Sequence, residues 1–176
     1  FISLVPNGEK QSVIDLTKKY KNLIVVRSLT KLLGLAGVRM GYVVTTPERL
    51  STWEKIRDPW PINTFAINAT NIIMKDKKMH NKWLKKVHKW IKKEGSWLEN
   101  NLSSFSSFKA LPTTTNFQLI KSNSSLTPLH QALKSKGILI RDCRSFINLG
   151  ENWLRISLRK RKHNIKIINS IREIIH

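Results

Sequence analysis

The sequence contains only one cysteine, Cys143, so no disulfide bond can form within the chain. A single cysteine is typical of proteins in a reducing compartment, and we expect a cytoplasmic location. No apolar run approaches the roughly 18 to 20 residues that a membrane-spanning helix needs, so no membrane partner is expected. A basic-then-apolar leader is also missing, and nothing in the sequence indicates export.

Acidic residues are scarce: 11 Asp and Glu stand against 32 Lys and Arg, which gives a net charge of +21. This charge fits a nucleic-acid partner or an anionic substrate, and it equally fits a lysine-rich surface. Lysine, isoleucine and asparagine are abundant together, which favours a general compositional bias. No zinc-finger spacing, RNP-like aromatic motif or arginine-rich arm is present, so we expect neither a nucleic-acid partner nor a metal site. A basic nucleic-acid-binding module stays open as a remote alternative.

At 40% hydrophobic residues the chain can bury a core, and its apolar periodicity predicts an α/β fold. In the first part we expect a helix at 9–20, a buried strand at 22–27, a strand at 40–44, a helix starting at Thr46 and Pro47, and a helix at 65–74. After Pro112 we expect a strand at 117–120, a helix at 126–136 with Gly137 as its C-cap, strands at 138–141 and 153–158, and a helix at 164–175. We therefore expect two domains, residues 1–74 and 75–176, with the boundary near Lys75.

Residues 75–105 form the longest periodic stretch, with apolar side chains on one face and lysines mostly elsewhere. This pattern fits a helix that binds a membrane surface or a partner protein. It also fits a long amphipathic helix that packs on a core and exposes a solvated lysine face, which is the interpretation we favour. Glu94 on the apolar side weakens both interpretations.

The stretch around which the chain is organised is 27–42. An apolar strand leads into Ser28, Lys31 follows three residues later, and Arg39 lies eight residues beyond Lys31 among glycines at 34, 37 and 41. A covalent lysine needs burial or nearby positive charge, and a phosphate needs a forked cation with a hydroxyl or backbone donor. These residues permit a covalent anion-binding site, but taken alone they also permit a surface lysine.

Ser28-Leu-Thr-Lys31 and Gly37-Val-Arg39-Met-Gly41 resemble the pyridoxal-phosphate motif of class I/II aminotransferases. The resemblance covers essentially the whole chain, and it is closest to the branch that contains histidinol-phosphate aminotransferase and threonine-phosphate decarboxylase. Further pieces resemble the decarboxylase: Phe1-Ile-Ser-Leu-Val-Pro6, Pro59-Trp-Pro-Ile-Asn63, Thr115-Asn-Phe117, Ile138-Leu-Ile-Arg-Asp-Cys143 and Trp153-Leu-Arg155.

The resemblance implies a fold-type I pyridoxal-phosphate enzyme, of which this chain is the C-terminal half: the end of the large domain and the small domain. Lys31 would carry the cofactor and later move protons, while Ser28 and Arg39 would hold its phosphate. Arg155 would bind the substrate carboxylate. Arg141 would contact a second substrate anion, and Asn116 would help to position the substrate. Without the resemblance, Arg155 between Leu154 and Ile156 would be taken as a surface charge at a strand edge.

The resemblance also implies that part of the cofactor site is missing from this sequence. The family uses an aspartate at the pyridinium nitrogen, an asparagine at the ring hydroxyl and a stacked aromatic ring, all expected before Phe1. Of the family's Asp-Glu-Ala-Phe run only the phenylalanine remains, at Phe1. The chemistry depends on that aspartate, because a protonated ring nitrogen makes the cofactor an electron sink.

On this basis we expect decarboxylation of L-threonine O-3-phosphate to aminopropanol phosphate in cobalamin biosynthesis, with pyridoxal 5'-phosphate as cofactor. An aminotransferase of the histidinol-phosphate type is the alternative, since the sequence does not show how the substrate carboxylate is oriented. The expected partners are a phosphorylated amino acid and a second copy of the chain, as a homodimer.

We predict that the 176-residue chain, expressed and purified alone, has little or no activity, because the expected aspartate is not part of it. Carbon dioxide release from threonine phosphate, assayed with added pyridoxal phosphate, measures this. Sustained turnover by the purified chain would contradict the prediction.

Overall fold

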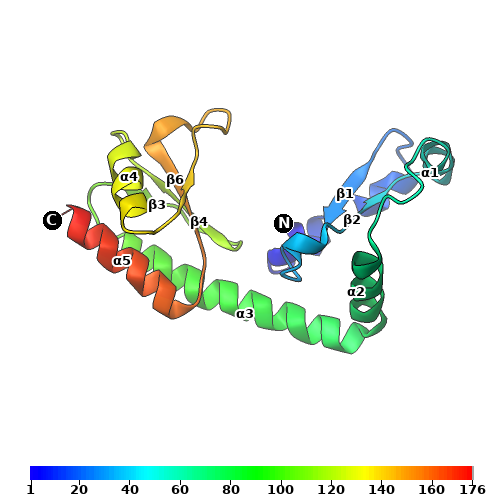
Figure 1. Ribbon diagram of the computed structural model, residues 1–176, viewed down its shortest axis with the longest axis horizontal. Helices are drawn as coiled ribbons and strands as arrows, with labels where there is room; N and C mark the ends of the chain where they lie inside the picture. Colours follow the sequence, from blue (N-terminus) through cyan, green and yellow to red (C-terminus); the bar gives the residue numbers. More distant parts are fainter. Residues whose placement is uncertain (176) are drawn as a thin grey trace. The chain divides into compact units, whose positions relative to one another are not determined.

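The structure, a computed structural model, describes residues 1–175 and divides the chain into two compact units, residues 1–87 and residues 88 onward. The helix α3, Lys77–Leu102, runs through the division as one continuous element (Figure 1). The predicted domain boundary lies near the first turn of α3, and the division of the compact units falls later in the same helix. The domain assignment stays a prediction.

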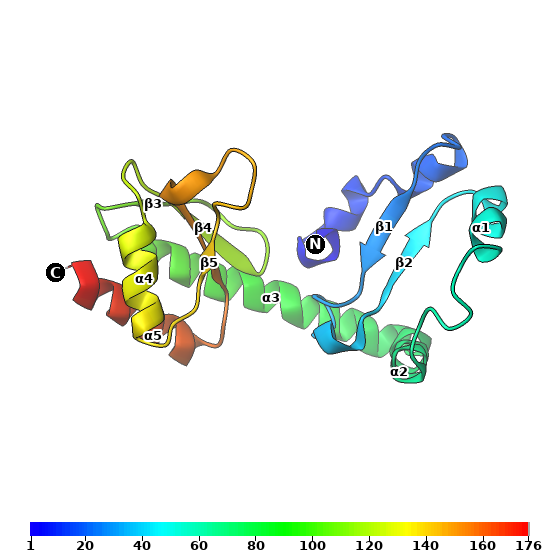
Figure 2. The same ribbon diagram turned by 45° about the horizontal axis from the view of Figure 1, so that its top comes forward.

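The first unit is built on an antiparallel pair of strands, β1 (Val25–Ser28) and β2 (Gly41–Val44), which lie side by side in Figure 2. Short 3-10 helices precede and connect them: η1 (Ile2–Leu4), η2 (Gly8–Gln11), η3 (Ile14–Lys18) and η4 (Ala36–Val38). Two α-helices follow, α1 (Pro47–Glu54) and α2 (Thr64–Lys75). The prediction that Thr46 starts a helix is confirmed, because its Oγ1 accepts a hydrogen bond from the Arg49 backbone N–H.

Two predictions for the first unit are wrong. The helix at 9–20 is replaced by η2 and η3, which are separated by Ser12, in extended conformation, and Val13. The Ser12 hydroxyl binds the backbone N–H of Ile14 and the Arg27 guanidinium, so its side chain competes with helix continuation. The strand β1 is also not buried on both faces: Val26 is 78% exposed, since β1 pairs only with β2 among the described residues.

The amphipathic interpretation of residues 75–105 is confirmed by the burial along α3. Its inward face contains Val87, Ile91, Leu98 and Leu102, which are at most 9% exposed, whereas its lysines lie in solvent. No helix within residues 1–175 is long and apolar enough to cross a membrane.

The second unit contains an antiparallel sheet in the order β3-β4-β6-β5. Its strands are β3 (Lys109–Ala110), β4 (Phe117–Lys121), β5 (Arg141–Asp142) and β6 (Trp153–Ser157). The other elements are α4 (Thr127–Ser135), η5 (Gly150–Asn152) and α5 (Arg161–Ile175). Gly137 has a φ of +71°, which confirms it as the residue that ends α4.

The strand predicted at 138–141 is shorter than expected and is limited to β5. The residues before β5 form hydrogen bonds to α4 instead of to the sheet. The Ile138 N–H donates to the Leu133 carbonyl, and the His130 ring contacts the Ile140 carbonyl. Hydrogen bonds to α4 thus take the place of the strand-to-strand hydrogen bonds that the apolar residues 138–140 predicted.

The two faces of this sheet differ in burial. Gln118, Ile120, Leu154 and Ile156 face the core and are at most 2% exposed. The helix α3 approaches this core closely at Gly95, where a Cβ atom would lie 3.7 Å from the Leu158 side chain. The opposite face presents residues such as Phe117, Leu119 and Arg155, which stay partly exposed. This second face is the one available to a ligand.

An ion pair between a buried carboxylate and a partly exposed arginine fixes the start of α5 against α3. The Arg161 guanidinium donates twice to the Glu94 carboxylate, at 3.0 and 3.1 Å, and stacks over Trp97. Asn164, fully buried, donates to Glu94 at 3.1 Å and also binds the backbone N–H and carbonyl of Arg159. The hydrogen bonds from Arg161 hold the pKa of Glu94 below its ordinary value, against the opposing effect of burial.

We predict that Glu94→Gln lowers the free energy of unfolding by about 2 to 3 kcal/mol at pH 7, because charge-assisted hydrogen bonds are lost in a buried position. The contribution of Glu94 is present above its ordinary pKa of 4.5 and is lost as the pH falls through the lowered folded value. The variant should therefore lose less stability than the wild type in that acidic range. Urea unfolding at a series of pH values measures both effects.

Glu99→Gln is the matched control, since Glu99 lies on the same helix and has no ion-pair partner among residues 1–175. If both variants unfold alike at pH 7, the ion pair does not stabilise the second unit.

Candidate active site

The end of β1 positions the motif that includes Ser28 and Lys31. Ser28 pairs with Gly41 across the strands, and the Leu29 N–H donates to the Met40 carbonyl at 3.2 Å. Gly41 permits this close approach, because a Cβ atom there would lie only 2.7 Å from the Arg27 carbonyl oxygen. The strand pairing thus brings the chain around residue 40 back to the end of β1.

A cleft of about 370 Å³ opens beside the end of β1, and both Ser28 and Lys31 line it. The Ser28 hydroxyl lies 2.8 Å from the Thr30 hydroxyl and accepts the Thr30 backbone N–H, so the turn after β1 presents two hydroxyl groups. Lys31 and Ser28 are exposed. The cleft therefore combines an accessible amine with hydroxyl donors, which is a set suited to a phosphorylated carbonyl compound.

Arg39 is not among the residues that line this cleft. Its backbone is left-handed, with a φ of 60°, and its guanidinium donates to the Ala36 carbonyl at 2.9 Å. The side chain of Asn63 donates to the carbonyl of Val38, the residue before Arg39, at 3.1 Å. The Oδ1 atom of Asn63 also accepts the Ala66 N–H at the start of α2. The structure thus fixes the Arg39 backbone next to the strand end, and the role of Arg39 in phosphate binding stays a prediction.

Sequence reasoning missed an ion pair that holds Arg27, one of the residues that line the cleft. The Arg27 side chain, only 10% exposed, donates to both carboxylate oxygens of Glu9 at 2.7 and 3.2 Å. Ser3 donates to the same carboxylate. Burial would raise the pKa of Glu9, but the hydrogen bonds from Ser3 and Arg27 outweigh it and lower the pKa. Nothing in the local sequence pairs Glu9 with Arg27, because the contact depends on the fold.

The other predicted site residues lie on the exposed face of the second unit's sheet. Arg141 on β5 and Arg155 on β6 are direct register partners, so they share this face. The Arg155 guanidinium lies over Phe117, 5.0 Å from the ring centre. Asn116 precedes β4, and its buried Oδ1 has no hydrogen-bond partner among the described residues. The sheet therefore brings Arg141 and Arg155 together, with Asn116 beside the strand that carries Phe117.

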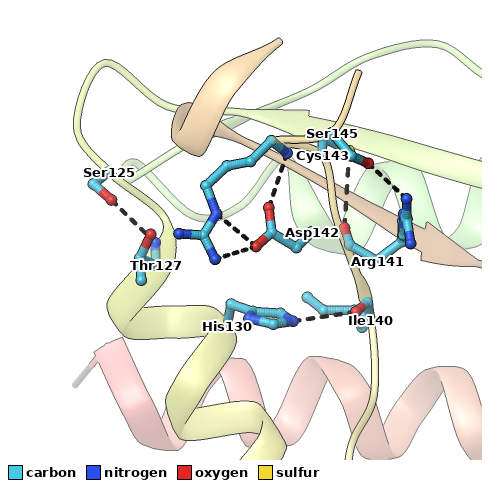
Figure 3. Close-up of polar contacts among 9 residues, drawn as sticks. Ser125, Thr127, His130, Ile140, Arg141, Asp142, Cys143 and Ser145 are labelled. Atoms are coloured by element: carbon cyan, nitrogen blue, oxygen red, sulfur yellow. Dashed lines mark hydrogen bonds and ion pairs between the residues drawn. The ribbon is translucent and has the colours of Figure 1, made fainter. Parts of the chain in front are cut away.

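The turn after β5 holds Arg141 in place (Figure 3). Arg141 donates to the Ser145 hydroxyl at 2.7 Å, and Arg144 forms an ion pair with Asp142. The hydrogen bonds from Arg144 lower the pKa of Asp142. Cys143 lies within this turn with its side chain buried, and burial raises the pKa of its thiol despite the nearby charge of Arg155. These contacts make the turn a defined support for Arg141.

Residues 1–171 match the aminotransferase class I and II family. The chain belongs to this family. Among curated relatives, a protein of Caldanaerobacter subterraneus subsp. tengcongensis provisionally named threonine-phosphate decarboxylase is 29% identical over 98% of this chain and 46% of its own length. Histidinol-phosphate aminotransferase 2 of Archaeoglobus fulgidus is 33% identical over 93% of this chain and 46% of its own length.

The fold agrees with the family. The crystal structure of histidinol-phosphate aminotransferase from Clostridium acetobutylicum matches with a TM-score of 0.86 and 26% identity, over 99% of this chain and 52% of that one. The chain thus spans about half the length of the proteins it matches, and the expected fold, part of a fold-type I transferase, is confirmed.

Class I and II aminotransferases use pyridoxal 5'-phosphate, and the structure of the Sinorhizobium meliloti histidinol-phosphate aminotransferase was solved in complex with it. The residues of this chain fit the cofactor by their donor chemistry. The cleft supplies an accessible amine at Lys31 and hydroxyl groups at Ser28 and Thr30. The amine suits the aldehyde of the cofactor, and the hydroxyl groups suit its phosphate.

We predict that Gly41→Ala destabilises the chain by about 1 to 3 kcal/mol, because the added methyl group meets a backbone oxygen that cannot move aside freely. Gly37→Ala is the control from the same motif: a Cβ atom at Gly37 meets nothing within 4 Å. The control should be neutral or stabilise by about 0.5 kcal/mol. Urea unfolding compares the two, and equal stabilities would show that the close strand pairing at Ser28 is not required.

Proposed function

We propose that this chain is the C-terminal portion of a pyridoxal-phosphate-dependent threonine-phosphate decarboxylase. The observation that carries the proposal is the pair Arg141 and Arg155, which share one partly exposed sheet face in register. Within residues 1–175 no carboxylate lies within ion-pair distance of either guanidinium. Two such cations suit a substrate that carries a carboxylate and a phosphate, as threonine phosphate does.

In this proposal each residue has one task. Lys31 attaches the cofactor and carries a proton to and from the substrate, and Ser28 and Arg39 bind the cofactor phosphate. Arg155 binds the substrate carboxylate, Arg141 binds the substrate phosphate, and Asn116 uses its unpartnered amide oxygen to orient the substrate. The bound cofactor supplies an electron sink for bond cleavage at the substrate α-carbon.

The reaction depends on how the substrate carboxylate is held. If the residues around Arg155 orient the substrate carboxylate so that its bond to the α-carbon breaks, carbon dioxide leaves. If they orient the substrate so that the α-carbon loses its proton instead, transamination follows. The sequence pieces that resemble the decarboxylase, and the relative that carries this name, support the first outcome.

The full protein would act as a cytoplasmic homodimer.

An aminotransferase that acts on histidinol phosphate is the second candidate. The Archaeoglobus fulgidus relative, at 33% identity, carries that name, as do further relatives of similar identity. Histidinol phosphate has a phosphate but no carboxylate. In such an aminotransferase, Arg141 and Arg155 would therefore bind different substrates when the amino group is taken up and when it is passed on.

We predict that the full-length protein releases carbon dioxide from threonine phosphate, and that Lys31→Ala lowers this rate by at least about a thousandfold, since the covalent attachment and the proton carrier are lost together. Borohydride reduction followed by peptide mass spectrometry should place the cofactor mass on Lys31 in the wild type only. Lys82→Ala, an exposed lysine outside the cleft, is the control and should retain both properties.

Product analysis separates the candidates. Formation of a keto product that requires 2-oxoglutarate, without carbon dioxide release, would assign the protein to the aminotransferases. Salt-sensitive DNA or RNA binding with no cofactor on Lys31 would instead favour the basic binding module.

A further inference from the structure

The ring of Phe146 lies between the two arginines of the exposed sheet face. Its centroid is 5.3 Å from the Arg141 guanidinium carbon and 5.7 Å from that of Arg155. Arg155 also lies over Phe117, so its guanidinium is in contact with two aromatic rings. A single side chain thus links the two cations that the register of β5 and β6 brings together.

The position of the Phe146 ring offsets the repulsion between the two guanidinium groups. Like charges directly opposite each other in a sheet repel, and neither Arg141 nor Arg155 has a carboxylate partner within residues 1–175. An aromatic ring attracts a cation through its quadrupole without neutralising the charge or occupying the N–H groups. In the same described range Arg155 donates no side-chain hydrogen bond, so its N–H groups remain available to a ligand.

The turn 142–146 places the ring. The Phe146 N–H donates to the carbonyl of buried Cys143 at 2.9 Å. The Asp142–Arg144 ion pair closes the turn, with 2.6 Å between the charged atoms. Arg141 donates to the Ser145 hydroxyl at 2.7 Å, a contact that can be followed in Figure 3. Phe146 is 39% exposed, which means that it is fixed mainly by its turn and by the arginines, and not by a core.

We propose that Phe146 is a positioning residue that sets the separation of the Arg141 and Arg155 guanidiniums, so that this face selects ligands with two anionic groups over ligands with one. The inference rests on the proposed function and deepens it, because it names the feature of the substrate that the face recognises. The carboxylate and the phosphate of one ligand molecule bind the two arginines together only when the arginines keep this spacing.

The test measures affinity, and not turnover, on the full-length protein that carries Lys31→Ala in every sample to block turnover. Any reaction of the probe's amine with the cofactor aldehyde contributes equally in all variants, so selectivity is compared between variants. O-phospho-L-threonine is the probe with two anionic groups, and inorganic phosphate is the probe with one. Isothermal titration calorimetry gives both dissociation constants. Phe146→Leu should weaken O-phospho-L-threonine binding about tenfold, since two cation–π contacts are lost. Phosphate binding should change less than about threefold.

Phe146→Tyr keeps an aromatic face and should retain the selectivity of the Phe146 protein, in contrast to the leucine variant. Ile147→Ala, a 91% exposed neighbour in the chain, is the matched control and should leave both affinities unchanged. Thermal unfolding of each variant checks the fold. If the leucine variant is unstable, Phe146→Met, which fills a similar volume without an aromatic ring, decides the question: it should lose the selectivity that the tyrosine variant keeps.

Two results would overturn the inference: a Lys31→Ala protein with Phe146 intact that binds phosphate as tightly as O-phospho-L-threonine, or a Phe146→Leu variant of it with unchanged selectivity. Because no step of this test requires carbon dioxide release, the absence of decarboxylation would reject the proposed function and leave the role of Phe146 intact.

Discussion

The ion pair between Glu94 and Arg161 is the contact on which the geometry of the second unit depends. Through Asn164 it also binds both backbone groups of Arg159, the residue that leads from β6 to α5. The end of β6 is further joined to the chain before β4, since the Leu158 N–H donates to the Asn116 carbonyl. A charge buried in α3 therefore determines where the strand that carries Arg155 ends.

The first unit is held together by a different kind of interaction. Its buried apolar residues are few among those described, including Leu4, Leu32 and Ala66, and much of its order comes from polar contacts between distant segments. The Trp83 indole donates to the Leu32 carbonyl, and Arg27 joins the first residues of the chain to β1. Such a unit defines a cleft through a small number of hydrogen bonds, each of which matters to the cleft's shape.

Sequence patterns predicted the elements whose cause is local. The apolar face of α3 and the Thr46 cap follow from side chains a few residues apart, and Gly137 after α4 follows from the positive φ that glycine adopts easily. The helix at 9–20 failed because Ser12 binds Arg27, which no local pattern encodes. The site residues came from a resemblance to a family, whereas the Arg27–Glu9 pair and the ring between Arg141 and Arg155 required the fold. What sequence reasoning misses here is contact between side chains from separate elements.

The single cysteine of the chain has a practical consequence. Cys143 is fully buried, and burial raises the pKa of its thiol, so both access and thiolate content are low in the folded state. A thiol reagent can react with it only after the turn beneath Arg141 has opened. The rate of alkylation thus measures how often this part of the chain opens, and it reports on the second unit alone, without the need to engineer a probe.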